Sequence, residues 1–192
     1  MQPTATVTIL PVPVSPTDRD YAAAEAGEPG FVFDRYVAGL WVGYAVGPPF
    51  GDRLVTWDEL QRLGLSQPWL REQAATYLDA VVDRVRIHGQ PPALTLFFAG
   101  MEASLVLAPR LWDRLADRVP GDVVIGVPAR DVVIVTGSRS SVGVARVRRE
   151  VDRVFAGGRR HLVTRDLFVR RDGQWQPWSA AEDRSRPSPV LP

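Results

Sequence analysis

Two polar residues at a predicted strand-to-helix junction are the first candidates for chemistry in this sequence of 192 residues. Glu102 could act as a general base or metal ligand, with Ser104 as a binding hydroxyl. In the structural alternative, the two residues form an N-terminal cap, because the helix dipole and the unpaired first-turn amides stabilise a carboxylate there. The sequence favours the cap. Ser104 also lacks the G-x-S-x-G setting of a nucleophile, and no histidine lies at a suggestive position.

Arg130 and Asp131 form a second candidate, between two valine-rich runs. An ionised carboxylate in or beside a core must be paired, because an unpaired buried charge costs several kcal/mol. In the structural alternative, which the sequence favours, Asp131 caps turn amides and Arg130 lies in solvent. In the functional alternative, Asp131 is an acid/base group or cation ligand and Arg130 holds an anion. Convergence of Asp131 and Glu102 in a pocket would favour the functional alternative.

A Gly/Ser-rich loop at 137–143 lies between a predicted strand and a predicted helix. Backbone amides at a helix N-terminus can hold an anion, which makes Ser138 and Arg139 candidate ligands for a phosphate-like group. The loop lacks the lysine of a P-loop, and its two glycines are one residue too far apart. We therefore expect an ordinary capped connection, with phosphate binding as the alternative.

An arginine-rich segment follows this loop and could track the backbone of a nucleic acid. Glu150 and Asp152 are interleaved with the arginines, and no aromatic stacking platform lies beside them. A solvated helix face is the favoured interpretation, and nucleic-acid binding is not expected. The cluster consists of Arg146, Arg148, Arg149, Arg153, Arg159 and Arg160.

Two tryptophans near the end of the chain are candidates for an interaction surface. Trp175 and Trp178 fall in the last predicted hairpin, where they could form an exposed patch for a partner. Their alternative place is the core, where most of the six tryptophans are expected.

The composition excludes several kinds of chemistry. The sequence has no lysine and no cysteine, so it offers no Schiff base, no thiolate nucleophile and no cysteine-bound zinc. His88 and His161 are far apart and lie in no metal-binding motif. We therefore expect no cofactor and no metal. A net charge of +1 gives no basic excess. The absence of a long apolar run or a basic leader makes a cytoplasmic protein without membrane association the expectation.

The elements that would position these residues centre on a buried hairpin. The β-branched runs 123–127 and 132–136 flank a predicted turn at 128–131, and neither run alternates with polar residues, so both faces of each strand should be covered. Further hairpins are predicted at 31–46 and 167–178, and an edge strand at 6–14. Capping signals at Thr56 and Ser66 begin two helices.

The fold predicted from this order of elements is α+β: a mainly antiparallel sheet built from hairpins, with about three longer helices packed against it. The alternating stretch 94–155 leaves room for one parallel strand pair. Residues 1–178 should form a single domain. Residues 179–192, which are rich in charge, Ser and Pro, should be a disordered tail.

These segments, in this order, resemble the uncharacterised bacterial YtpQ family. The likeness rests on T-V-T-I-L-P-V, on F-V-F-D followed by L-W-V-G-Y-A, on Ala74-Ala75 with Leu78, on Glu102-Ala103-Ser104 and on V-P-A-R-D-V-V-I-V. It covers residues 5–178 and corresponds to the C-terminal part of the family, whose members typically have an additional N-terminal segment. The resemblance implies a fold and a soluble bacterial setting. It implies no reaction and no catalytic residue.

From the sequence we expect a cytoplasmic binding or interaction domain without catalytic activity that recognises a protein partner. The alternative is an enzyme or ligand-binding protein that acts on an anionic, phosphate-like small molecule through Glu102, Asp131, Arg130 and the loop 137–141. An enclosed pocket with both carboxylates would favour the alternative, and a flat apolar patch would favour the interaction domain.

Overall fold

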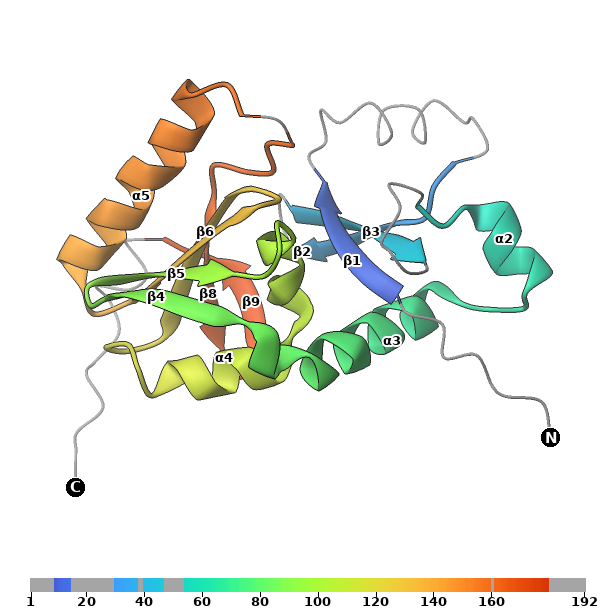
Figure 1. Ribbon diagram of the computed structural model, residues 1–192, viewed down its shortest axis with the longest axis horizontal. Coiled ribbons are helices and arrows are strands. Elements are labelled where there is room, and N and C mark those ends of the chain that lie inside the picture. The colour runs from blue at the N-terminus through green and yellow to red at the C-terminus, as the bar shows by residue number, and fades with distance from the viewer. Residues whose placement is uncertain (1–8, 15–29, 38–39, 47–53, 160, 180–192) are drawn as a thin grey trace.

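A computed structural model of the protein describes residues 9–14, 30–37, 40–46, 54–159 and 161–179. Within these residues the strands form a three-stranded sheet of order β1-β3-β2 and a six-stranded sheet of order β4-β5-β7-β6-β8-β9 (Figure 1). The elements, with 3-10 helices written η, are β1 (Ile9–Val14), β2 (Phe33–Val37), β3 (Leu40–Val46), α2 (Trp57–Arg62), α3 (Gln67–Ala80), η1 (Val82–Arg84), β4 (Arg86–Gln90), β5 (Ala93–Phe97), η2 (Glu102–Leu107), α4 (Pro109–Ala116), β6 (Val123–Ala129), β7 (Val132–Gly137), α5 (Ser141–Ala156), β8 (Leu167–Arg171) and β9 (Gln174–Pro177).

The hairpin of β6 and β7 occupies the middle of the six-stranded sheet, and every residue of β6 is buried. This confirms the central hairpin predicted from the two valine-rich runs. The strand continues two residues further than predicted, to Ala129, which pairs with Val132. The turn is therefore Arg130-Asp131 alone, and an irregularity in the register between Gly126 and Ala129 accommodates the extra length.

Helices cover both faces of this sheet (Figure 1). Val123, Ile125 and Val135 point to the face covered by η2 and α4, whereas Val124 and Ile134 point to the face covered by α5. This alternation explains the unbroken apolar runs, because each successive side chain enters one core or the other. The valine-rich pattern therefore reports a strand buried on both faces.

The three-stranded sheet also has side chains packed on both faces, in the main core on one face and in a smaller cluster on the other. Leu40, Val42 and Tyr44 face the main core, and Trp41 and Ala45 face a smaller cluster. β3 pairs antiparallel with β2, which confirms the hairpin predicted at 31–46. β1 is an edge strand, as its two prolines require.

Local signals also place the helices correctly. Thr56 accepts a hydrogen bond from the amide of Glu59 at 3.3 Å, and the Glu59 carboxylate accepts from the Thr56 amide at 3.0 Å, which completes the predicted capping box. Ser66 caps α3 with Pro68 in its first turn. These contacts satisfy amides that would otherwise lack partners at each helix start.

The α+β class is confirmed, and the structure adds three details. The segment before Pro91, to which the sequence assigned no element, is the edge strand β4. The helix expected after Gly100 is broken at Ala108 into η2 and α4. Every strand pair among the described residues is antiparallel, so the possible parallel pair does not occur there. The tail predicted at 179–192 lies outside the described residues, apart from Ser179.

No helix within the described ranges combines the length and the apolarity needed to span a membrane.

Candidate functional site

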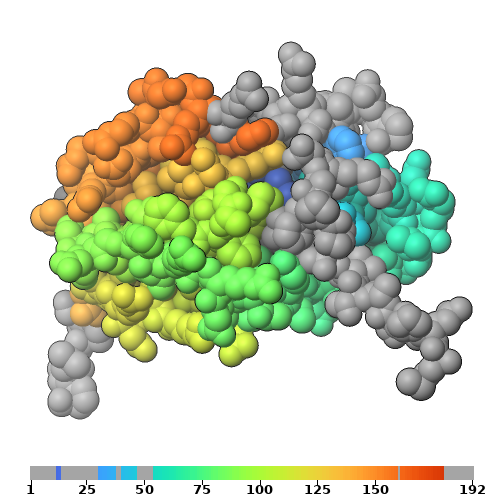
Figure 2. All heavy atoms as spheres, viewed as in Figure 1, coloured from blue at the N-terminus to red at the C-terminus, as the bar shows by residue number. Residues whose placement is uncertain are grey.

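A groove of about 490 Å³ lies between helix α5 and the outer face of strands β5 and β7. Its size is within the range of small-molecule sites, roughly 300–1,000 Å³. Figure 2 shows the orange atoms of α5 beside the green atoms of β4 and β5 on the visible face of the molecule. The lining residues are Ala93, Thr95, Val132, Ile134, Arg146, Glu150, Arg153, Val154, Gly157 and Arg159.

The position of α5 over the sheet creates this groove. Val144, Val147 and Val151 form the buried stripe of the helix and pack over β6 and β7. Gly126 on β6 allows the close approach, since a Cβ there would lie 2.8 Å from methyl groups of Val147 and Val151. The helix is thus held over the middle of the sheet, and the outer face of β5 forms the open side of the groove.

Three arginines and one glutamate give the groove a positive lining. Arg153 forms an ion pair with Glu150 at 2.9 Å, and Arg159 forms one with Asp131 at 2.8 Å. Both arginines remain at least half exposed, and exposed pairs of this kind contribute only about 0–1 kcal/mol. The Arg146 side chain forms no ion pair or hydrogen bond with any described residue. All three guanidinium groups can therefore turn to an incoming anion.

The groove has the chemistry of a binding site. Ala93, Val132 and Ile134 supply an apolar floor, and Thr95 is a hydroxyl on the same strand face. The lining contains one carboxylate and no histidine, so it offers neither a pair of carboxylates nor a base beside a nucleophile. Among the described residues, no three carboxylate or imidazole side chains gather as a metal site.

Glu102, the first residue singled out from sequence, lies outside this groove and is 4% exposed. Its Oε1 accepts hydrogen bonds from the amides of Phe98 at 2.7 Å and Gly100 at 3.1 Å. Its Oε2 is buried and has no hydrogen-bond partner among the described residues. Ala99 and Gly100 adopt positive φ angles of 52° and 82°, so the carboxylate holds together the left-handed turn that precedes η2.

The neighbouring candidates are separated by their contacts. Ser104 is buried, at 1% exposure. The carbonyl of Arg130 accepts from the amide of Ala103 at 2.9 Å, and its Nε donates to the carbonyl of Pro13 at 3.2 Å. Asp131 instead faces the groove arginine Arg159. The Glu102 and Asp131 carboxylates thus serve different contacts, although a hydrogen bond joins the adjacent residues Ala103 and Arg130.

The Gly/Ser loop after β7 uses its polar groups within the protein. Ser138 donates its amide to the carbonyl of Asp122 at 2.8 Å, and its Oγ accepts from the Asp122 amide at 3.0 Å. The amide of Arg139 donates to the carbonyl of Pro120, and Ser140 Oγ accepts from the amide of Gly143 at 3.1 Å. These bonds occupy amides that an anion cradle would need to leave open.

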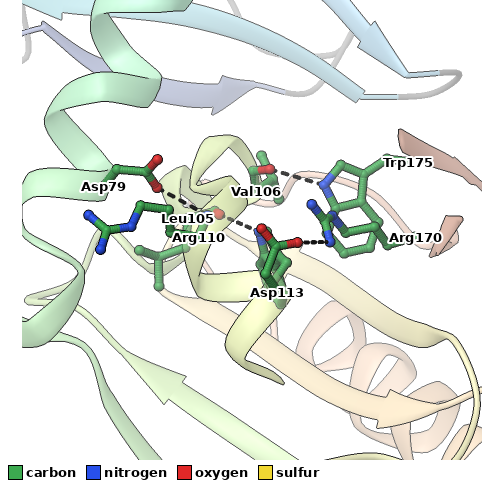
Figure 3. A network of polar contacts seen from close by, with 8 residues as sticks. Asp79, Leu105, Val106, Arg110, Asp113, Arg170 and Trp175 are labelled. Carbon is green, nitrogen blue, oxygen red and sulfur yellow. Dashed lines mark hydrogen bonds and ion pairs between the residues drawn. The ribbon is translucent and has the colours of Figure 1, made fainter. Parts of the chain in front are cut away.

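Trp175 and Trp178 both lie partly buried. Trp175 donates from Nε1 to the carbonyl of Val106 at 3.0 Å (Figure 3) and meets Trp112 edge-on, with ring centroids 5.0 Å apart. Trp178 packs against the α5 core with its Nε1 buried, and the guanidinium of Arg148 lies 5.3 Å from its ring centroid. The structure thus places the first indole against η2 and α4 and the second against α5.

Sequence reasoning found the arginines but interpreted them as a solvated helix face. It did not place Thr95 opposite them. The available signal was the alternation in β5, where Leu94 and Leu96 face the main core and Thr95 faces the other side. That pattern indicates a strand with one less apolar face, but only the docking of α5 brings this face to Arg146 and Arg153.

Fold and groove together define a class: an α+β protein with a positively lined surface groove. The chain is similar to several proteins named UPF0354 protein, a name that states no activity. It is 28% identical over 159 residues to the one from Bacillus cytotoxicus and 28% identical over 162 residues to the one from Bacillus cereus strain AH187. A further UPF0354 protein, from Bacillus anthracis, is also 28% identical over 162 residues.

Each alignment covers 80% of this chain, and the chain spans 57% of the length of these relatives. No family model matches the sequence. No solved structure matches it either.

Proposed function

We propose that this chain is a non-catalytic binding domain that holds an anionic ligand in the groove between α5 and the β5–β7 face. The observation that carries the proposal is the excess of cations: Arg146, Arg153 and Arg159 in the lining stand against the carboxylate of Glu150 in the lining and that of Asp131 beside it. Arginine presents a planar fork of donors that matches phosphate and carboxylate groups. An anion of either kind would therefore find complementary charge and geometry there.

The existing ion pairs do not oppose such binding. Arg153 and Arg159 line the groove while paired with Glu150 and Asp131, and these solvent-exposed pairs are weak. A ligand with two negative charges can add to these contacts or replace them. Because the guanidinium groups are exposed, binding should weaken as salt screens the charges.

The absence of catalytic machinery from the lining supports binding over reaction. The sequence suggested a ligand site around Glu102 and the loop 137–141. We propose instead that the ligand binds at Arg146 and Arg153 in the groove. Recognition of a protein partner stays a prediction, because no observation on the described surface favours a particular partner.

We also propose that the chain is a cytoplasmic protein of the YtpQ type. The order of its segments, which resembles that of the YtpQ family, supports the assignment to the YtpQ type. The similarity to proteins named UPF0354 agrees with an uncharacterised family.

Calorimetric titration of the full chain with inorganic tripolyphosphate at low salt tests the proposal. We expect measurable binding that weakens on addition of sodium chloride. Arg146→Gln combined with Arg153→Gln should lower the affinity about tenfold, since two exposed charge contacts contribute roughly 0.2–1 kcal/mol each.

Arg149→Gln is the matched control, because Arg149 is an exposed arginine of the same helix that does not line the groove. The control should bind tripolyphosphate as the unmodified protein does. A loss of binding free energy per removed charge that is as large in the control as in the double variant would contradict the groove and indicate a general effect of net charge. Absence of binding to the unmodified protein would also contradict it.

A further inference from the structure

An exposed aromatic residue lies next to the groove. Phe97, at the end of β5, is 48% exposed, which is unusual for a phenylalanine in a strand of a protein with a large core. His88 on the edge strand β4 contacts it edge-on, with ring centroids 4.9 Å apart. His88 is itself exposed. The two rings therefore present an aromatic surface to solvent.

Strand periodicity puts this aromatic surface on the groove side of the sheet. Side chains two residues apart on a strand share a face, so Phe97 shares its face with Thr95 and Ala93, both of which line the groove. His88 is the cross-strand partner of Thr95, and paired residues also share a face. Phe97 and His88 thus continue the groove floor toward the edge of the sheet.

The strand register also places Phe97 near a cationic end of the groove. Leu96 pairs with Val133, so Phe97 lies beside Val132, a lining residue. The β6–β7 turn directly precedes Val132 and carries Asp131, which binds Arg159. Helix α5 runs back along β7, so its C-terminal Arg153 also lies toward this end. Aromatic rings and guanidinium groups are therefore neighbours on one surface.

We propose that the anionic ligand of this groove is a nucleoside phosphate, either free or within a single strand. Its base stacks on Phe97 and His88, and its phosphate contacts Arg153, Arg159 and Arg146. Exposed aromatic rings beside cations on a sheet face are the elements that single-stranded nucleic acids and nucleotides use, because every base has a π-face and every nucleotide a negative charge. The sequence argued against nucleic acid because acidic residues are interleaved with the arginines and no aromatic stacking platform lies beside them. Folding supplies Phe97 and His88 from other strands.

This inference rests on the proposed anion-binding groove, and one titration series separates the two. The unmodified protein is titrated with ATP and with inorganic tripolyphosphate, which shares the phosphate chain but has no base. If the base stacks, ATP should bind about tenfold more tightly than tripolyphosphate. Phe97→Leu, which keeps an apolar side chain but removes the ring, should abolish this difference and leave tripolyphosphate binding unchanged.

Trp57→Leu is the control, because it removes a comparably exposed aromatic ring, 42% exposed, on α2. This variant should retain the preference for ATP. Circular dichroism of each variant checks that the fold is intact. Equal binding of ATP and tripolyphosphate, with no effect of Phe97→Leu, would overturn the nucleotide inference and leave the anion groove standing. Absence of binding by either ligand would overturn both.

A single-stranded oligoadenylate then distinguishes the two sources of the nucleotide. Tighter binding of the oligonucleotide than of ATP, lost in Phe97→Leu, supports a nucleotide within a strand. Tighter binding of ATP supports a free nucleotide.

Discussion

Arg71 on α3 donates a hydrogen bond from Nε to Oδ2 of Asp34 on β2 over 2.7 Å. Its second guanidinium nitrogen lies 2.6 Å from the same oxygen, and the Tyr44 hydroxyl donates to it at 2.9 Å. Asp34 is only 13% exposed. This contact joins the three-stranded sheet to α3, and Tyr36 extends it by stacking under Arg71 and donating to the carbonyl of Val106.

Loss of the Asp34 carboxylate should therefore destabilise the fold. Asp34→Ala leaves both the guanidinium of Arg71 and the hydroxyl of Tyr44 without their acceptor, and we expect a loss of about 2 kcal/mol in the free energy of unfolding. Urea denaturation measures it. Asp83→Ala is the control, because Asp83 forms an ion pair with Arg114 in which both partners are more than half exposed. It should cost less than about 1 kcal/mol, and equal losses in the two variants would contradict the role of Asp34.

Tyr44 should make the stability of the protein sensitive to alkaline pH. Burial, together with the nearby negative charge of Asp34, raises the pKa of Tyr44 well above its usual value of 10.0. The folded protein thus holds the phenol proton more tightly than the unfolded chain does. The resulting stabilisation is fully present below pH about 10, where an unfolded tyrosine titrates, and is lost as the pH rises toward the pKa of the folded state.

The free energy of unfolding of Tyr44→Phe should consequently fall less steeply above pH 10 than that of the unmodified protein. Comparing each protein with its own value at neutral pH removes the constant effect of the lost hydroxyl. Burial raises the pKa of Tyr36 as well, so some dependence remains in the variant. Parallel curves for the two proteins would count against the coupling of Tyr44 to folding.

Gly143 tests how closely the first turn of α5 packs against its neighbours. A Cβ at this position would lie 2.5 Å from the carbonyl oxygen of Pro92 and still closer to Thr136 Oγ1. Gly143→Ala should therefore push the first turn of α5 off the sheet and cost about 1–3 kcal/mol in thermal or urea unfolding. Val142→Ala, at a neighbouring position that is 66% exposed, should change stability little. A neutral Gly143→Ala would show that the helix start has room.

The strands and caps could be predicted from sequence because their causes are local. The β-branched runs around Arg130 and Asp131 specify a buried hairpin, and Thr56 with Glu59 specifies a helix start. The strand β4 was missed because His88-Gly89-Gln90 is polar and leads into two prolines. An edge strand with an exposed face needs no apolar pattern, and its pairing with β5 provides its stability.

The groove could not be predicted in the same way, because it depends on contacts between distant segments. Arg146 and Arg153 are spaced for one helix face, which the sequence makes visible. That face lies beside β5 only because α5 packs closely on β6, and Gly126 provides the space for this packing. No local sequence pattern predicts that docking. None predicts that Phe97 lies next to the groove either.

Backbone amide chemical shifts, followed by NMR while the full chain is titrated with tripolyphosphate, test the anion groove most directly. The account predicts that the largest changes occur at Thr95, Arg146 and Arg153, and that they diminish when salt is added. Changes concentrated in the loop 137–141 and around Glu102, with the groove residues unaffected, would contradict it.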